Sequence, residues 1–150
     1  MNLGQYNTLT ILRETDPGLF LGDEKGLEVL LPHKYKPAKY NIGDALEVFV
    51  YLDNEERPIA TSEEPFLTLN TFGYLRCCDV NKHGAFLDWG LVKQLFVPFR
   101  EQARPMKVGH WYVVYLYLDQ QTNRLVGSSK TNRFLTQEGM TLKKFDARSE

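Results

Sequence analysis

The sequence contains the same pattern twice, 66 residues apart, and this repeat restricts the fold more than any other feature. Residues 41–53 and residues 107–119 each place an apolar residue before a glycine, continue with a β-branched and aromatic run, and end in Tyr-Leu-Asp. The same spacing relates residues 18–21 to 84–87 and 29–32 to 95–98, and one inserted residue brings 57–62 onto 124–129. Blocks that recur in the same order indicate an internal duplication.

The duplication predicts two small domains, at residues 1–65 and 66–135, followed by a polar tail or linker to further domains at 136–150. Units of roughly 65 residues fold alone, although with little stability to spare. Hydrophobic residues make up 43% of the chain and charged residues 25%, which are values of globular proteins, so neither half is expected to be disordered.

Each half is predicted to form five short strands separated by Gly, Pro, Asn and Asp turns. No segment inside either half shows helical periodicity over three turns, which makes the fold class all-β. An open sheet of this size would expose two edges, so a closed barrel is expected. Alternation supports closure, because one face of each long strand is apolar: Leu46, Val48, Val50 and Leu52 in the first copy, and Tyr112, Val114, Leu116 and Leu118 in the second. The predicted strands are 6–12, 19–21, 28–31, 46–52 and 59–62, and then 74–80, 85–88, 94–97, 112–118 and 125–129.

The net charge of −1 conceals an asymmetry between the halves. Residues 1–65 carry 6 Lys and Arg against 12 Asp and Glu, a net −6, whereas residues 66–150 carry 12 against 7, a net +5. A basic half can bind a polyanion. Equally, two halves of opposite charge can attract each other, and the sequence leaves both interpretations open.

Six segments of the second half together resemble the S1 (S-one) domain, the five-stranded OB barrel first described in ribosomal small-subunit protein S1. They are Gly73-Tyr-Leu-Arg, Gly84-Ala-Phe-Leu, Leu95-Phe-Val-Pro, Val108-Gly, Leu118-Asp and Arg124-Leu-Val-Gly-Ser-Ser. With Leu30-Leu-Pro-His-Lys-Tyr and Val48-Phe-Val-Tyr-Leu-Asp in the first half, the chain resembles the N-terminal part of the bacterial conserved virulence factor B family. The resemblance covers about residues 1–135 and implies two tandem five-stranded OB-fold barrels. That family continues into a third such module and a winged-helix domain.

The resemblance implies binding of single-stranded RNA on the face formed by the second and third strands, where aromatic platforms stack bases and cations hold phosphates. Carried over by position, the platform is Phe86, with His83 and Lys82 before it. An acidic and basic pair, Asp119 with Arg124, follows the long strand. The corresponding residues of the first half are Phe20, Asp53 and Arg57. The histidine that usually closes the third strand is replaced by Pro98, and by Pro32 in the first copy.

Several of these residues have a structural alternative. Phe86 and Phe20 could belong to the barrel core. The cations Lys82, Arg100, Arg104, Lys107 and Lys130 could form a phosphate track or be isolated surface charges. Trp89 could stack a base or close one end of the barrel, and Tyr115 with Tyr117 could be a contact between modules.

Other classes of site have no support in the sequence. The histidines and the adjacent Cys77 and Cys78 fit no zinc-binding spacing, and no catalytic motif is found, so neither a metal, another cofactor nor an enzyme is expected. Neighbouring cysteines on a strand point to opposite faces, which argues against a disulfide and for the cytoplasm. No apolar run approaches the roughly 20 residues of a membrane helix, so no membrane partner is expected.

Two functions are consistent with these features. The first is a monomeric, cytoplasmic RNA-binding regulator that contacts single-stranded RNA through the second barrel. The alternative is a protein-interaction or scaffold role, in which the barrels position C-terminal nucleic-acid-binding domains that this chain lacks.

Overall fold

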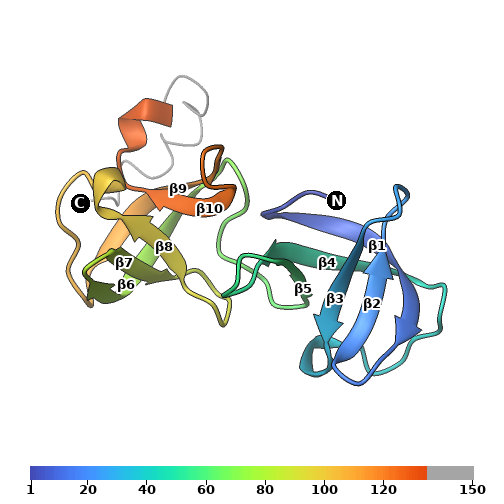
Figure 1. Ribbon diagram of the computed structural model, residues 1–150. Helices are drawn as coiled ribbons and strands as arrows, with labels where there is room; N and C mark the ends of the chain where they lie inside the picture. The colour runs from blue at the N-terminus through green and yellow to red at the C-terminus, as the bar shows by residue number, and fades with distance from the viewer. Residues whose placement is uncertain (135–150) are drawn as a thin grey trace. The chain divides into compact units, whose positions relative to one another are not determined.

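The computed structural model describes residues 1–134, and these form strands and short 3-10 helices only, which confirms the all-β prediction (Figure 1). The chain divides into two compact units, Met1–Glu64 and a second that begins at Pro65. The predicted tail, 136–150, lies outside the described residues. No helix within residues 1–134 is long and apolar enough to cross a membrane.

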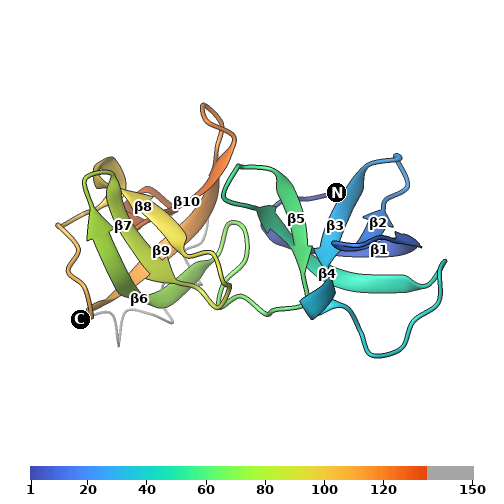
Figure 2. The same ribbon diagram turned by 60° about the horizontal axis from the view of Figure 1, so that its bottom comes forward.

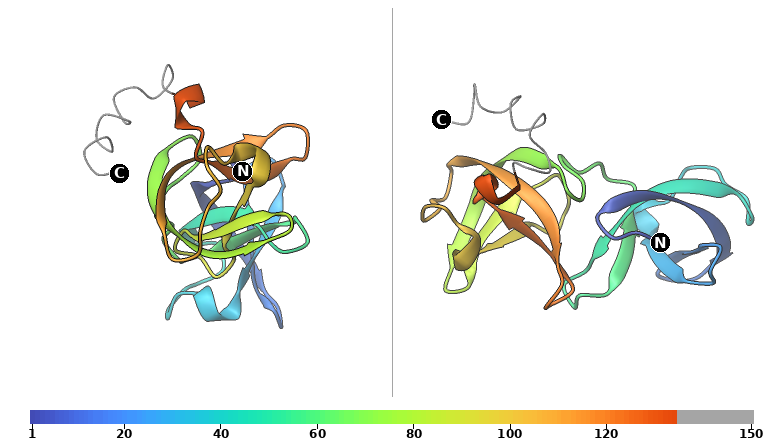
Figure 3. Two further views of the ribbon diagram at one scale, coloured as in Figure 1. Left: turned by 90° about the vertical axis from the view of Figure 1, so that its left-hand side faces the viewer. Right: turned by 90° about the horizontal axis from the view of Figure 1, so that it is seen from above.

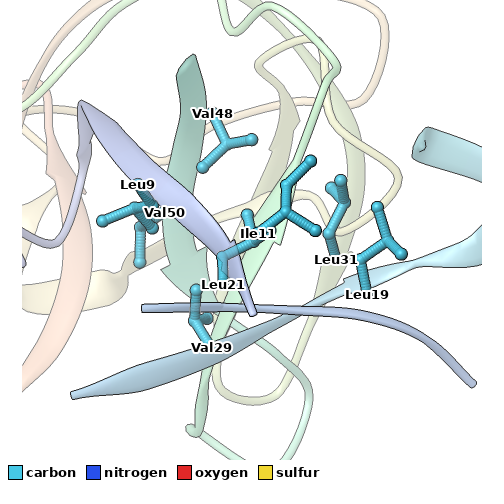
Figure 4. Packing of buried hydrophobic residues seen from close by; sticks show 9 residues of the cluster. Leu9, Ile11, Leu19, Leu21, Val29, Leu31, Val48 and Val50 are labelled. Atoms are coloured by element: carbon cyan, nitrogen blue, oxygen red, sulfur yellow. The ribbon is translucent and has the colours of Figure 1, made fainter. Parts of the chain in front are cut away.

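The first unit is a closed five-stranded barrel with the strand order β1-β2-β3-β5-β4. Its elements are β1 (Gln5–Glu14), β2 (Gly18–Gly22), β3 (Glu28–Pro32), η1 (His33–Tyr35), β4 (Ala45–Leu52) and β5 (Pro58–Thr61). A parallel contact between Leu30 and Ile59 closes the ring. Figure 4 shows the interior, where leucine, isoleucine and valine side chains from β1, β2, β3 and β4 meet. Burial of these apolar side chains is the main force that holds the barrel together.

The second unit is a curled five-stranded sheet with the order β10-β9-β6-β7-β8. Its elements are β6 (Phe72–Asn81), β7 (Gly84–Asp88), β8 (Leu95–Pro98), η2 (Phe99–Glu101), β9 (Trp111–Asp119), β10 (Arg124–Ser128) and η3 (Thr131–Phe134). The two edge strands, β10 and β8, lie against each other. Gly127 of β10 is so close to β8 that an added Cβ would lie 3.0 Å from side-chain carbons of both Leu95 and Val97. Strands β6, β7 and β8 run side by side (Figure 2), and their outer face carries the candidate site.

The duplication extends to details of the backbone. The first strand of each unit has a register shift at matching places, between Ile11 and Arg13 in β1 and between Cys77 and Asp79 in β6. The glycines that open β2 and β7 have φ of 155° and 153°, values that L side chains rarely adopt. A Cβ added at Gly84 would lie 2.5 Å from the carbonyl oxygen of Val97, so a close approach of β7 to β8 requires glycine there.

The long strands bury the residues predicted to point inward, but burial does not alternate strictly, because Phe49, Tyr51 and Tyr115 of the opposite face are buried too. Val48 and Val50 of β4, and Val114 and Leu116 of β9, are buried in their barrels. On the outer side of β9, Tyr115 packs between Phe72 and Phe134. The helix η3 therefore covers part of this outer face (Figure 3).

Candidate nucleic-acid interface

The centre of the candidate site is a pair of phenylalanines on the outer face of β7 and β8. Ala85 and Leu87 are fully buried, so alternation turns the side chain of Phe86 outward, where it is partly buried. Phe96 lies directly opposite Phe86 on β8, and the two ring centroids are 5.2 Å apart at an interplanar angle of 34°. Phe86 is therefore not a residue of the barrel core, and it forms a two-ring apolar platform with Phe96.

Cationic side chains gather at one end of this platform. Gly84 pairs with Pro98, which places the β6–β7 turn, with the exposed Lys82 and His83, at the same end as η2. Within η2, the exposed Arg100 donates a hydrogen bond from Nη2 to Oδ2 of Asp119 at 3.0 Å. Phe86 follows Gly84 by two residues along β7, so the platform begins roughly 7 Å from this end of the strand.

The β9–β10 hairpin carries a further cation, and Arg100 reaches the base of this hairpin through its hydrogen bond to Asp119. Arg124 lies opposite Asp119 in the strand register. The Asp119 carboxylate also organises the turn, because it accepts hydrogen bonds from the backbone N–H of Gln121 and the hydroxyl of Thr122. These bonds, with the charge of Arg100, hold the pKa of Asp119 below its usual value. The carboxylate is therefore ionised at neutral pH and fixes Arg100 in place.

One acidic side chain borders the other side of the platform. Asp79 of β6 is exposed and lies opposite Phe86 in the register. Its carboxylate would repel a phosphate that approached across β6. A polyanion on this face is consequently favoured along β8 and the β9–β10 hairpin, on the side of Arg100 and Arg124.

The first unit has an equivalent aromatic side chain, but its own arginine covers it. Phe20 is turned outward between the buried Leu19 and Leu21. The guanidinium carbon of Arg13 lies 4.6 Å from the centroid of the Phe20 ring, a cation–π geometry, and Arg13 also pairs with Glu28 at 2.7 Å. The position of Arg13 in the register corresponds to that of Asp79 in the second unit, so the strand residue beside the ring is a cation in the first unit and an aspartate in the second.

The other predicted residues of the first unit form a structured turn. The backbone N–H groups of Glu55 and Arg57 donate to Oδ1 of Asp53, and Nε of Arg57 lies 3.3 Å from its Oδ2. Partial burial works to raise the pKa of Asp53, but the hydrogen bonds from Arg57 and Glu55 outweigh it and hold the pKa below the usual value. The Asp53–Arg57 pair thus stabilises the β4–β5 hairpin.

Sequence reasoning missed Phe96 as part of the platform and Arg100 as the partner of Asp119. Leu30 occupies the position of Phe96 in the first copy, so the repeat gave no aromatic signal there. Alternation around the buried Leu95 and Val97 could have placed Phe96 on the outer face. The contact between Arg100 and Asp119 joins residues 19 apart in the chain and depends on how η2 meets the hairpin.

Trp89 is structural. It is 2% exposed, and its Nε1 donates a hydrogen bond to the carbonyl oxygen of Lys93 at 2.6 Å, so it holds the β7–β8 connection. Within residues 1–134, no three His, Cys, Asp or Glu side chains lie where they could share a metal ion.

The five-stranded units and their outward platforms have the architecture of OB-fold barrels. The model of the S1 domain family matches residues 3–63. Uncharacterized protein YitL of Bacillus subtilis (strain 168) is 36% identical over 99 residues, which cover 65% of this chain and 33% of YitL. These findings confirm the predicted resemblance to S1 domains.

Both units have a counterpart of the same fold among solved structures. A multidomain protein with nucleic acid binding domains from Streptococcus pneumoniae TIGR4 aligns with a TM-score of 0.72 at 24% identity, over 89% of this chain and 48% of that one. This alignment confirms the prediction of two tandem OB-fold barrels. The chain spans between a third and a half of the length of these two proteins.

Proposed function

We propose that this chain is an RNA-binding protein of the cytoplasm that holds single-stranded RNA on the β7–β8 face of its second unit and acts as a regulator. The observation that carries the proposal is the Phe86–Phe96 platform, which lies on the outer face of a basic unit that also carries Arg100 and Arg124. The match to the S1 domain family and the nucleic acid binding domains of the Streptococcus pneumoniae protein support the same class of ligand. The free thiols of Cys77 and Cys78 suit a reducing compartment.

The site is suited to binding and not to catalysis. Stacking of one base on an aromatic ring contributes roughly 1–3 kcal/mol and tolerates any base, because every base has a π face. Cations at one end of the platform would follow the phosphates and make binding dependent on salt. Asp79 directs the phosphates away from β6, so the RNA strand would run along β8 toward the β9–β10 hairpin.

The first unit contributes less to binding in this proposal. Its ring, Phe20, is already in contact with the Arg13 guanidinium, and a base would have to displace that contact and the Arg13–Glu28 ion pair. Residues 1–65 also carry a net charge of −6, which repels the RNA backbone.

The test compares two matched substitutions in the full chain. Phe86→Ala should weaken binding to a twelve-nucleotide oligouridylate about five- to 150-fold, the equivalent of one stacked base. Phe20→Ala, its counterpart in the first unit, should change the affinity less than twofold. Phe86→Leu keeps an apolar side chain at the same place but has no π face, and should bind as weakly as Phe86→Ala. Circular dichroism establishes that each variant is folded.

The alternative is a scaffold role, and one observation favours it. Pro32 and Pro98 stand where S1-type domains usually carry a histidine, so neither unit has that ring. If Phe86→Ala and Phe86→Leu are folded and bind oligouridylate as tightly as the wild type, the platform is not used for RNA. The units would then serve to position other domains of a longer protein.

A further inference from the structure

A second pair of aromatic side chains, one exposed and one half-buried, lies on a different face of the second unit. Tyr74 of β6 and Trp111 of β9 are stacked, with ring centroids 5.4 Å apart and an interplanar angle of 28°. Trp111 is 51% exposed, although tryptophan side chains are highly buried on average. The pair takes no part in the β7–β8 platform.

The strand pattern explains why this pair faces outward. Leu75 and Cys77 point into the barrel, so Tyr74 and Arg76 point out, and β9 turns Trp111 to the same side. Further along this face, Phe134 of η3 stacks on Tyr115 with centroids 4.0 Å apart and covers that end. The face is therefore covered at one end and open at the other.

The surroundings of the pair are basic. Arg76 is exposed and lies opposite Trp111 in the register, and the turn that leads into Trp111 contains Lys107 and His110. Backbone hydrogen bonds between this turn and Cys77, at 2.8 Å, fix it against β6. Residues 104–118 include no Asp or Glu. The nearest carboxylate in the register is Asp88, opposite Arg76 on β7, and it accepts a hydrogen bond from the backbone N–H of Gly90.

We propose that Tyr74 and Trp111 form a second stacking site for an unpaired nucleobase, with Arg76 and Lys107 near the flanking phosphates. A base placed on Trp111 would extend the existing two-ring stack by one member, and neighbouring cations favour a polyanionic ligand over an apolar peptide. The proposal rests on the proposed function only in taking unpaired RNA as the ligand.

The two tryptophans of the chain make this site directly observable. Trp89 is buried and Trp111 is exposed, so a base that stacks on the protein surface quenches the emission of Trp111 and leaves that of Trp89. The probe is a twelve-nucleotide oligoadenylate, added to the full chain of the wild type, Phe86→Ala and Trp111→Ala. The affinity is measured in parallel by anisotropy of the same oligonucleotide with a far-red label.

The proposal predicts that oligoadenylate quenches the tryptophan emission of both the wild type and Phe86→Ala, and that Trp111→Ala binds about five- to 150-fold more weakly. Leu27→Ala, which removes an exposed apolar side chain from the first unit, is the control and should bind as the wild type does. Trp111→Phe should recover part of the affinity, because it restores a ring.

The outcomes separate this proposal from the proposed function. If oligoadenylate binds, as the anisotropy shows, but leaves the tryptophan emission unchanged and Trp111→Ala binds normally, the second site is refuted and the β7–β8 site stands. If Trp111→Ala loses affinity and Phe86→Ala does not, the second site stands and the platform is refuted. If no oligonucleotide binds, both are refuted, and the exposed pair is better explained as a surface for a protein partner.

Discussion

Replacement of Glu101 by glutamine should destabilise the second unit, because Glu101 is the centre of a buried polar network. The side chain is 4% exposed. Its Oε2 accepts a hydrogen bond from the hydroxyl of Tyr117 at 2.8 Å, and its Oε1 accepts one from Nη1 of Arg133 at 2.7 Å. Through Arg133, the network holds η3, whose Phe134 covers Tyr115. Glutamine preserves the shape of the side chain but removes its charge.

The expected cost follows from the exposure of the partners. Hydrogen bonds to a charged group contribute about 1.5–3 kcal/mol, and removal of one partner from a fully buried ion pair costs roughly 3–5 kcal/mol. Here the Arg133 side chain is 49% exposed, so water can solvate it after the substitution. The amide oxygen of glutamine can still accept from Tyr117. We therefore expect Glu101→Gln to lower the free energy of unfolding by about 1–3 kcal/mol at pH 7.

The pKa of Glu101 determines how the stability difference between the wild type and Glu101→Gln changes with pH. Burial works to raise the pKa of Glu101, but hydrogen bonds from Ser128, Tyr117 and Arg133 outweigh it and hold the pKa below its usual value. A carboxylate with a depressed pKa stabilises the fold fully above the unfolded value of about 4.3, and this contribution is lost as the pH falls through the folded pKa. The difference between the wild type and Glu101→Gln should therefore be constant from pH 7 to about 5 and shrink below about 4.3.

The assay is urea unfolding followed by tryptophan emission at several pH values. Trp89 and Trp111 both lie in the second unit, so the signal reports on that unit alone. Arg133→Gln and the double variant complete a cycle, in which the two single costs should not add because the side chains are in contact. The reasoning is refuted if Glu101→Gln is as stable as the wild type at pH 7, or if the difference does not change below pH 4.3.

Two further substitutions test the backbone and the platform. Gly84→Ala should cost about 1–3 kcal/mol of stability, because the new Cβ would meet the carbonyl oxygen of Val97. Gly109→Ala, which has a positive φ but no neighbour within 4 Å, should cost less in the same urea assay, and an equal cost would contradict the steric argument. Asp79→Arg should place a guanidinium over Phe86, as Arg13 lies over Phe20. Binding of oligouridylate should then strengthen at low salt and weaken at high salt, whereas strengthening at every salt concentration would show that Phe86 does not stack a base.

The repeat and the alternation of apolar residues were sufficient to predict the fold. Both depend on local sequence, so the ten strands and the burial of Val48, Val50, Val114 and Leu116 could be predicted from the residues themselves. The outward orientation of Phe86 also follows from alternation, once its strand is placed correctly.

The contacts that shape the site could not be predicted in this way, because they join residues far apart in the chain. The cover of Arg13 over Phe20 depends on the register between β1 and β2, which includes a shift. The ion pair between Arg133 and Glu101 spans 32 residues and forms only when η3 packs on the barrel. The effect of a difference between the two copies, such as Arg13 in place of Asp79, on the neighbouring phenylalanine can be inferred only when the strand registers are known.

A salt titration of oligouridylate binding by the wild type and Phe86→Ala tests the central claim most directly. On single strands, the logarithm of the binding constant falls with the logarithm of salt at a slope of about −0.7 for each phosphate that is neutralised. If Phe86 stacks a base and the cations hold the phosphates, Phe86→Ala shifts the line to weaker binding and leaves its slope unchanged. Arg124→Ala, in contrast, should make the slope shallower by up to about 0.7. Coincident lines for the wild type and Phe86→Ala, with both proteins folded, would contradict the claim that this face binds RNA.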